Sequence, residues 1–292
     1  MSEKIPAKKL ILVTGGAGFI GSHLCERLVR EGHCVISLDD YSTGSRGNHI
    51  PEIEYRKGHT RDIATLIPES PDMIYHLGEY ARVEQSFADI ARVLASNVVG
   101  TQAVLEFVRM RGGKLIYAGS STKYADGGIG KEQSPYAWSK ATNTDLVQRY
   151  GDWFGIDYAI TYFYNVYGPR ERSDPETGTV IGIFASCWKK GVPLPVRRPG
   201  TQKRNFTHIY DIVEGLVQVG ARGAGDEYGL GHPDAYSLEE VAQLFGGDIT
   251  WLEERPGNRM TSSVDIRRAT LELGWKPRYS LPEYIHGLTR TS

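Results

Sequence analysis

The sequence predicts an α/β protein with a doubly wound parallel sheet and a smaller C-terminal cap. Short apolar runs alternate with amphipathic helical stretches over the first 168 residues, and a glycine-rich turn joins the first run to the first helix. After Pro169 the alternation loosens, and Pro and Gly gather at 191–200 and 255–257. Regular β/α alternation favours a parallel sheet with its ligand crevice at the carboxyl ends of the strands.

The elements of this sheet can be placed along the chain. Leu24, Leu28 and Val29 form one face of a helix that ends at Gly32. The two longest helices are expected at 93–111 and 136–154. Continuous apolar runs are typical of strands that are buried on both faces of a sheet. The expected strands are 10–13, 35–38, 53–56, 73–76, 114–118 and 158–162.

Composition excludes several classes of function. The 34 basic and 35 acidic residues nearly cancel, so no sequence-wide basic field attracts nucleic acid or an anionic membrane. Cys25, Cys34 and Cys187 lack the spacing of a metal site or a disulfide framework. The N-terminal apolar run is too short for a signal peptide or a membrane span. We therefore expect a cytoplasmic protein without a structural metal, a nucleic-acid partner or a membrane partner.

A glycine turn indicates a dinucleotide site. Gly15, Gly18 and Gly21 follow the first strand and open the first helix, where bare backbone lets a pyrophosphate approach the helix N-terminus. Asp39 ends the second strand roughly 20 residues further on, and its carboxylate can accept hydrogen bonds from the adenosine ribose hydroxyls. A 2′-phosphate would be repelled there. The pattern predicts a Rossmann domain that binds NAD rather than NADP.

An acid/base pair follows further along the chain. Tyr136 and Lys140 in SPYAWSK are four residues apart, so on a helix they share one face. A lysine ammonium beside a phenol favours the phenolate, which lets the tyrosine act as a base near neutral pH. Such a pair is common on exposed helices and is weak evidence alone. The glycine turn upstream is what makes a catalytic role for this pair plausible.

At this point the sequence resembles the extended short-chain dehydrogenase/reductase family, which includes nucleotide-sugar epimerases and dehydratases. TGGAGFIGSHL (residues 14–24) is similar to the family's TGGxGFIGSHL. The stretch AGSSTKYA (118–125) resembles SSxxVYG, and FYNVYGPR (163–170) resembles YFNVYGPR. The likeness extends to DIRRATLELGWKP at 265–277, so it covers nearly the whole chain.

The resemblance implies further residues around the cofactor. Phe19 and Ile20 would contact the pyrophosphate through their backbone, and Asp62 with Ile63 would lie at the adenine. Leu77 and Gly78 would form the loop on the nicotinamide side, where Lys140 would also contact the cofactor.

The resemblance also implies the substrate site. Ser120 aligns with the serine or threonine that bonds the reacting sugar hydroxyl, and Asn165 with the asparagine that contacts a diphosphate. Arg204 and Arg255 would clamp that diphosphate. A small Ser262 would leave room for an N-acetyl group, where some epimerases have tyrosine. The expected substrate residues are Ser121, Thr122, Asn165, Arg204, Arg255 and Ser262.

The implied chemistry is removal of a proton from a sugar hydroxyl by Tyr136 while the attached carbon gives up hydride. Related 4,6-dehydratases have an Asp-Glu pair where this chain has Ser121 and Thr122, and related decarboxylases have Glu at the second position. Neither is present, so 4-epimerisation leads.

Glu79, where the family has a small residue, keeps a dehydratase open as the alternative. Glu79 could serve there as an extra acid/base, or it could be a loop acid paired with Arg82. A non-catalytic NAD(H) sensor and a dehydrogenase that releases NADH also stay open.

The resemblance also implies the organisation of the chain. We expect an NAD-binding Rossmann domain over 1–168, rejoined by a returning segment near 206–231, and a sugar-nucleotide-binding domain over 169–292. A UDP-linked sugar is the favoured substrate. A homodimer through the two long helices is expected.

Overall fold

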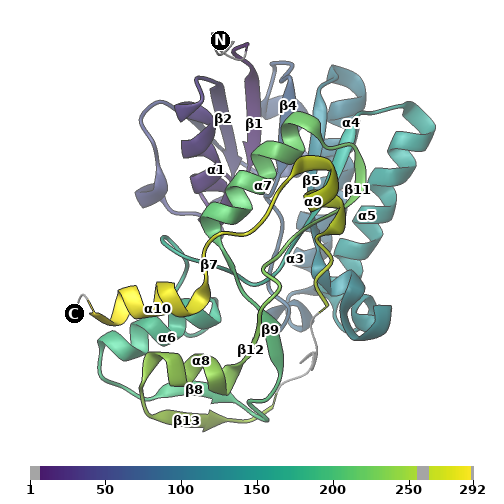
Figure 1. Cartoon of the computed structure of the whole chain (residues 1–292). Coiled ribbons are helices and arrows are strands. Elements are labelled where there is room, and N and C mark those ends of the chain that lie inside the picture. Colours follow the sequence, from purple (N-terminus) through teal and green to yellow (C-terminus); the bar gives the residue numbers. More distant parts are fainter. Residues whose placement is uncertain (1–6, 255–262, 291–292) are drawn as a thin grey trace.

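A seven-stranded sheet forms the centre of the molecule (Figure 1). The computed structural model describes residues 7–254 and 263–290. The strands follow the order β3-β2-β1-β4-β5-β6-β11, and each neighbouring pair is parallel, which confirms the predicted doubly wound sheet. The strands are β1 (Leu10–Thr14), β2 (Cys34–Asp39), β3 (Glu54–Lys57), β4 (Met73–His76), β5 (Lys114–Ser120), β6 (Tyr158–Phe163) and β11 (Gly225–Leu230).

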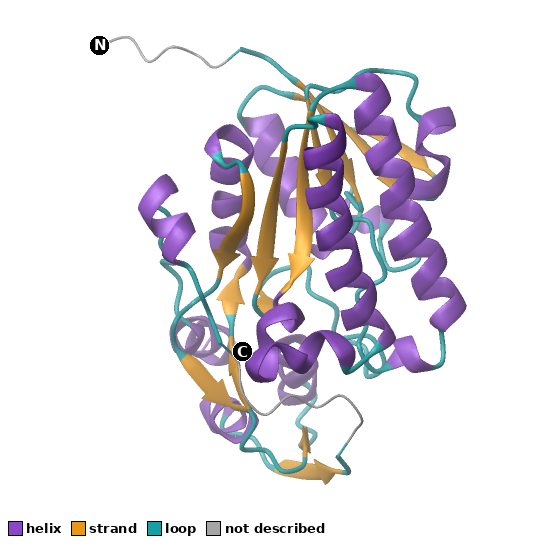
Figure 2. Ribbon diagram, turned by 90° about the vertical axis from the view of Figure 1, so that its right-hand side faces the viewer, coloured by secondary structure: helices purple, strands orange, loops and turns teal. Residues whose placement is uncertain are grey.

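Helices cover both faces of this sheet (Figure 2). Helices α1 (Phe19–Arg30), α7 (Ile209–Arg222) and α9 (Arg267–Leu273) lie on one face. Helices α2 (Ile63–Leu66), α4 (Gly100–Arg111) and α5 (Pro135–Phe154) lie on the other. Ile11 and Val13 pack toward the first layer and Leu12 toward the second. Because both faces are buried, the strands are continuously apolar rather than alternating.

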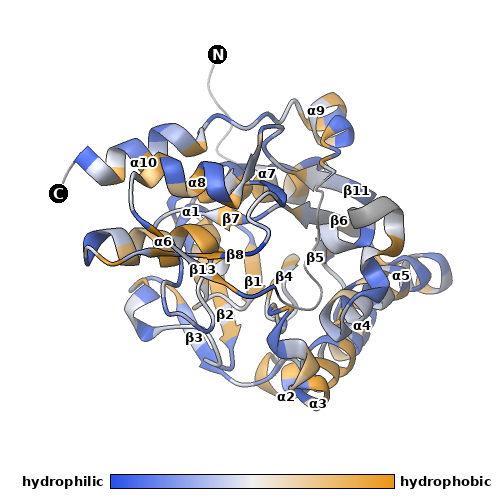
Figure 3. Cartoon of the chain, turned by 90° about the horizontal axis from the view of Figure 1, so that it is seen from below, coloured by the Kyte–Doolittle hydropathy of each residue, from blue (hydrophilic) through white to orange (hydrophobic). Residues whose placement is uncertain are grey.

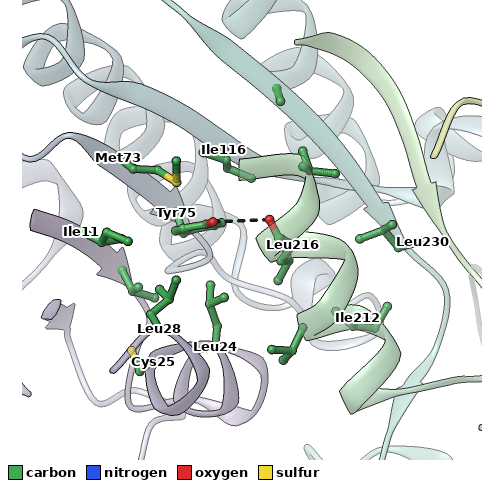
Figure 4. Packing of buried hydrophobic residues seen from close by; sticks show 14 of the residues in the cluster. Ile11, Leu24, Cys25, Leu28, Met73, Tyr75, Ile116, Ile212, Leu216 and Leu230 are labelled. Carbon is green, nitrogen blue, oxygen red and sulfur yellow. Dashed lines mark hydrogen bonds between the residues drawn. The ribbon is translucent and has the colours of Figure 1, made fainter. Parts of the chain in front are cut away.

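The core under α1 and α7 joins distant parts of the chain (Figure 4). Leu24 and Leu28 of α1 and Leu216 of α7 surround Tyr75, whose ring is fully buried. The Tyr75 hydroxyl donates to the Leu216 carbonyl oxygen at 3.4 Å, which satisfies its polar end inside the core. Cys25 is buried here as a small apolar residue.

The predicted helix at 93–111 contains a feature that its apolar pattern does not show. The helical segment begins with α3 (Ile90–Val93), passes through a π-helical stretch (Leu94–Val99) and continues as α4. Asn97 in this stretch accepts from the Tyr80 N–H at 2.7 Å and donates to the Tyr80 carbonyl at 3.0 Å. Such stretches occur often at functional sites, and this one fixes the loop after β4.

The cap has its own small core. The strand pairs β7 (Val166–Tyr167) with β10 (Thr207–His208) and β8 (Leu194–Arg197) with β13 (Ile249–Leu252) are parallel, and β9 (Lys203–Asn205) with β12 (Ala235–Ser237) is antiparallel. The helices are α6 (Val180–Lys189), α8 (Leu238–Phe245) and α10 (Leu281–Arg290). Phe184, Phe245 and Ile285 pack together between them. In Figure 3, which views the molecule from below, α6 carries several hydrophobic (orange) segments.

The described part of the chain is free of disulfides. Cys25 is buried, Cys187 is half-buried and Cys34 is exposed. Within residues 7–254 and 263–290, no three His, Cys, Asp or Glu side chains are grouped so that they could hold a metal ion. Over the same residues, no helix has both the length and the apolar composition to cross a membrane.

Candidate active site

A cavity of about 460 Å³ opens at the carboxyl ends of the sheet strands. Gly15 after β1, Asp39 at the end of β2 and Gly78 after β4 line it. Tyr136 at the start of α5 lies in the same wall, and Arg172 belongs to the segment that leads into the cap. The crevice therefore lies where a doubly wound sheet binds its ligands.

The glycine turn has the shape of a phosphate cradle. Gly15 adopts a positive φ of 74°, and its N–H donates to the Leu38 carbonyl at 2.8 Å. A Cβ on Gly21 would overlap the Gly15 carbonyl oxygen, so only glycine allows α1 to begin this close to the turn. Gly18 caps α1 without a side-chain hydrogen bond, which leaves the first N–H groups of the helix available to an anion. With Phe19 and Ile20, these glycines line the cavity and fit a dinucleotide pyrophosphate.

Asp39 is held rigidly at the adenosine end. Its two carboxylate oxygens accept from the Ala17 N–H at 2.9 Å and the Tyr41 N–H at 2.8 Å. Burial raises the pKa of Asp39, and these two hydrogen bonds act in the opposite direction. Each oxygen retains acceptor capacity for a ribose hydroxyl. The fixed carboxylate fits NAD.

Asp62 and Ile63, which the resemblance places at the adenine, are not among the residues that line the cavity. Ile63 is fully buried in the core under α4, and exposed Asp62 pairs with Arg61 at 3.6 Å. The residues that line this end are instead His59 and Thr60, with Gly58. The reason is that Ile63 begins α2, whose apolar side faces the sheet.

The proton-transfer pair lies at the start of α5. Ser134 Oγ accepts from the Ala137 N–H at 3.1 Å and caps the helix, and Pro135 occupies its first turn. The Tyr136 hydroxyl donates to Ser120 Oγ at 3.3 Å. Ser120 also accepts from Thr122 Oγ1 at 2.9 Å, and the neighbouring Ser121 is half-buried. Tyr136 lines the cavity, and buried Ser120 reaches it through this hydrogen bond without being one of the lining residues.

Lys140 forms a buried ion pair with Glu79. Its ammonium donates to Glu79 Oε2 and to the Ala118 carbonyl, and the two side chains are only 6% and 4% exposed. The ammonium also lies 4.5 Å from the centre of the Tyr117 ring. Glu79 is therefore not the loop acid paired with Arg82 that one interpretation of the sequence suggested. The pairing was missed because nothing in the sequence places residue 79 beside α5.

The second oxygen of Glu79 is saturated. Glu79 Oε1 accepts from Thr101 Oγ1 at 3.0 Å, the Tyr117 hydroxyl at 3.1 Å and Asn143 Nδ2 at 2.9 Å. Asn143 also donates to the Asn97 carbonyl of the π-helical stretch at 2.9 Å. Asn143 lies three residues beyond Lys140 on α5, a spacing from which it could have been found. These groups fix the carboxylate on every side.

His76 fastens the neighbouring loop in a neutral state. Its ring contacts Thr14 Oγ1 at 2.8 Å and Thr101 Oγ1 at 3.0 Å. Burial lowers the pKa of His76 to about 4, and the Lys140 charge contributes in the same direction. Thr14 Oγ1 in turn accepts from the N–H groups of Leu77 and Gly78 at 3.1 Å and 2.9 Å. The loop on the predicted nicotinamide side is thus held to β1.

The predicted diphosphate residues lie in the cap segment. Asn165 has a φ of 36°, and its Nδ2 donates to the Asn205 carbonyl at 2.8 Å. Arg204 is half-buried, and its Nη1 donates to the Lys203 carbonyl at 2.8 Å. Neither residue is among those that line the cavity. Arg255 and Ser262 lie outside the described residues.

Three arginines in the cavity wall were not predicted from the sequence. Arg170 pairs with Glu26 of α1 at 2.7 Å, and Arg172 donates to the Thr43 carbonyl at 3.3 Å. The Nε of Arg82 is buried without a hydrogen-bond partner in the described part of the chain. Burial lowers the pKa of Arg82, and neighbouring Arg172 acts in the same direction. Arg172 also pairs with Asp174 at 2.9 Å, so the charges of Arg170 and Arg172 are each paired with a carboxylate.

Comparison with known proteins decides the family. A family model described as the NAD dependent epimerase/dehydratase family matches residues 11–231. The chain belongs to this family. UDP-glucuronic acid decarboxylase 1 of Xenopus tropicalis is 30% identical over 317 residues, which cover 100% of this chain and 72% of the relative.

Solved structures of the family have the same fold. A UDP-glucose 4-epimerase of Thermus thermophilus, in complex with NAD, is 27% identical with a TM-score of 0.87, over 96% of this chain and 98% of that one. A dTDP-glucose 4,6-dehydratase of Streptomyces venezuelae is 29% identical with a TM-score of 0.87, over 97% and 95%.

Family membership confirms the resemblance to extended short-chain dehydrogenases/reductases. The protein is an NAD-dependent enzyme rather than a non-catalytic sensor. The names of these three relatives cover decarboxylation, epimerisation and dehydration, so membership of the family does not determine which reaction this enzyme catalyses.

Proposed function

We propose that the enzyme is a nucleotide-sugar 4-epimerase that acts on UDP-linked sugars and recycles NAD. The main observation behind the proposal is that no carboxylate among the described residues near Tyr136 is available as an additional acid or base. Glu79, the one carboxylate among the described wall residues beside Tyr136, is bound to Lys140 and saturated at its other oxygen. Thr122 stands where related dehydratases and decarboxylases have glutamate. Elimination of water needs an additional acid and base, whereas epimerisation does not.

The described residues can supply the proton chemistry of this reaction. Tyr136 takes the proton of the C4 hydroxyl, which Ser120 holds through its Oγ, and later returns a proton to the same oxygen. Lys140 stabilises the phenolate between these two steps. When bound at the glycine turn, NAD would supply the hydride acceptor for C4 and, in its reduced form, the hydride donor to the other face of the sugar.

The nucleotide and the sugar are assigned from the cap. Two named relatives act on UDP-linked sugars, and Arg204 and Arg255 supply guanidiniums suited to a diphosphate. We further propose tolerance of N-acetylhexosamines, which depends on the small side chain of Ser262. A Ser262→Tyr variant should lose turnover of a UDP-N-acetylhexosamine and keep turnover of UDP-glucose. Unchanged turnover of both would contradict this assignment.

A panel of nucleotide sugars, including UDP-glucose, a UDP-N-acetylhexosamine, dTDP-glucose and UDP-glucuronic acid, tests the reaction. Products are identified by NMR. Inversion at C4 without accumulation of NADH supports the proposal. Loss of water, loss of carbon dioxide or stoichiometric NADH would show a dehydratase, a decarboxylase or a dehydrogenase instead.

We also propose a homodimer through α4 and α5. Apolar residues are exposed on these helices, with Met110, Trp138, Trp153 and Phe154 at 72%, 48%, 60% and 50%. The rings of Trp153 and Phe154 lie side by side, 6.2 Å between their centres, and exposed apolar surface of this kind often marks protein interfaces. Light scattering should give twice the mass of the 32.5 kDa chain, and a Trp153→Glu variant should be monomeric. A monomeric wild-type protein at micromolar concentration would contradict the proposal.

A further inference from the structure

The ammonium of Lys140 has only one N–H left for a ligand. A lysine ammonium has three N–H donors, and two of them are directed to Glu79 Oε2 and the Ala118 carbonyl. Both acceptors are themselves fixed, Ala118 in strand β5 and Glu79 by three further donors. The long lysine side chain therefore has a defined position, and its third N–H has a defined direction.

The charge around Tyr136 is also set by this ion pair. The Glu79 carboxylate largely cancels the Lys140 charge in a site that is shielded from water. The other titratable groups that face the ion pair add no negative charge that could substitute for the Glu79 carboxylate. His76 is neutral because burial lowers its pKa to about 4, and the pKa of Tyr117 is raised well above its ordinary value by burial and by Glu79. Arg82 interacts electrostatically with Tyr136 and is independent of the ion pair.

We propose that Glu79 is a positioning residue for the catalytic pair, which orients the Lys140 ammonium and, by cancelling part of its charge, weakens the stabilisation that this ammonium gives to a Tyr136 phenolate. The inference rests on the proposed function, in which the same tyrosine first takes and then returns a proton. A phenolate that is stabilised too strongly is a weak base. Glu79 keeps the two directions of proton transfer balanced.

A spectroscopic titration tests this without any substrate. Tyrosinate absorbance is followed against pH in the NAD-saturated protein, and the curve of Tyr136→Phe is subtracted to isolate Tyr136. The same difference is taken in the Glu79→Gln background. Glutamine keeps the size of the side chain and removes its charge, so the Tyr136 midpoint should move to lower pH by about one unit. The acid limb of the kcat/KM profile should move with it.

The matched control is a second ion pair, outside the cavity. Asp226 pairs with Lys123 at 3.3 Å and accepts from the Tyr162 hydroxyl at 2.6 Å. Asp226→Asn removes a comparable charge and should leave the Tyr136 midpoint unchanged. A shift of equal size in the control would show a general effect of lost charge and would overturn the proposal, as would a folded Glu79→Gln protein with no shift.

Glu79→Asp tests the positioning role separately. It keeps the charge but shortens the side chain by one methylene, so kcat should fall roughly tenfold with little change in the midpoint. An unchanged kcat would contradict the positioning role, and this variant also serves if Glu79→Gln does not fold. The titration needs no turnover. If the enzyme proved to catalyse another reaction, the proposed function would be refuted, but the titration would still test the role of Glu79.

Discussion

The Tyr136 hydroxyl donates a hydrogen bond to Ser120 Oγ at 3.3 Å, and this contact links the start of α5 to the end of β5. The two residues are 16 apart in sequence, and the helix cap at Ser134 determines where the tyrosine projects. The proton-transfer centre is therefore built on two rigid elements rather than on a loop.

Removal of the Tyr136 hydroxyl should stop the reaction without loss of the cofactor. Tyr136→Phe should lower kcat by at least about 100-fold, because general acid/base catalysis contributes on the order of 10²–10⁴. NAD should remain bound, since the glycine turn and Asp39 are untouched. Turnover by NMR and bound NAD after denaturation measure the two effects. Tyr279→Phe, at an exposed position in the cap, is the control, and activity retained by Tyr136→Phe would refute the assignment.

A methyl group at Gly21 should damage the cofactor site. The added Cβ would overlap the Gly15 carbonyl, so α1 must move away from the turn. We expect Gly21→Ala to weaken NAD binding at least about tenfold and to lower stability by about 1–3 kcal/mol. Calorimetric titration and thermal unfolding measure this. Gly287→Ala, where a Cβ would meet nothing within 4 Å, should leave NAD binding unchanged and should not lower stability, because alanine is favoured over glycine inside a helix such as α10. Equal behaviour of the two variants would contradict the prediction.

Arg82 should contribute to substrate binding. Its buried Nε has no partner in the described residues, and its Nη1 donates to the Ala81 carbonyl at 3.2 Å. A ligand acceptor that pairs with a charged donor is worth roughly 1.5–3 kcal/mol. Arg82→Gln should therefore raise KM about tenfold and change kcat little. Arg197→Gln, which removes the 3.5 Å pair with Glu84, is the control. A fall in kcat at constant KM would show that Arg82 acts in the chemical step.

Glu171 should make stability depend on pH. Burial raises the pKa of Glu171 to about 7 from an ordinary value of 4.5. The folded state thus holds a proton that the unfolded state releases, so this contribution to stability is complete below pH 4.5 and is lost as the pH rises to 7. Glu171→Gln should gain about 2 kcal/mol relative to wild type between pH 5 and pH 8. Urea unfolding at both pH values measures it, and a constant difference between the proteins would contradict the prediction.

Much of the fold could be predicted from local patterns. The strand predicted at 73–76 matches β4, and the helix predicted at 136–154 matches α5 (Pro135–Phe154) within one residue, because both patterns depend on residues close together in the sequence. The π-helical stretch could not be predicted, since it has the same apolar pattern as an ordinary helix and depends on the contacts of Asn97 with Tyr80.

The site shows the same division. The glycines and Asp39 follow from a motif with fixed spacing, and the structure places them in one wall of the cavity. The partner of Glu79 could not be inferred, because residues 79 and 140 meet only through the order of the strands. A sequence motif predicts the positions of the residues within it. Contacts between side chains of different helices and strands depend on the tertiary structure.

The last strand of the sheet, β11, has a consequence for synthesis of the protein. The core around Tyr75 includes α7, β11 and Trp275, and the Trp275 indole donates to the Asp211 carbonyl at 3.0 Å. When only the first six strands have left the ribosome, α1 covers part of this face of the sheet, and the part that α7 and α9 cover in the folded protein is exposed. The nascent chain must therefore wait for its C-terminal quarter before the nucleotide-binding half is buried, and truncation before Trp275 should yield aggregates rather than a smaller folded domain.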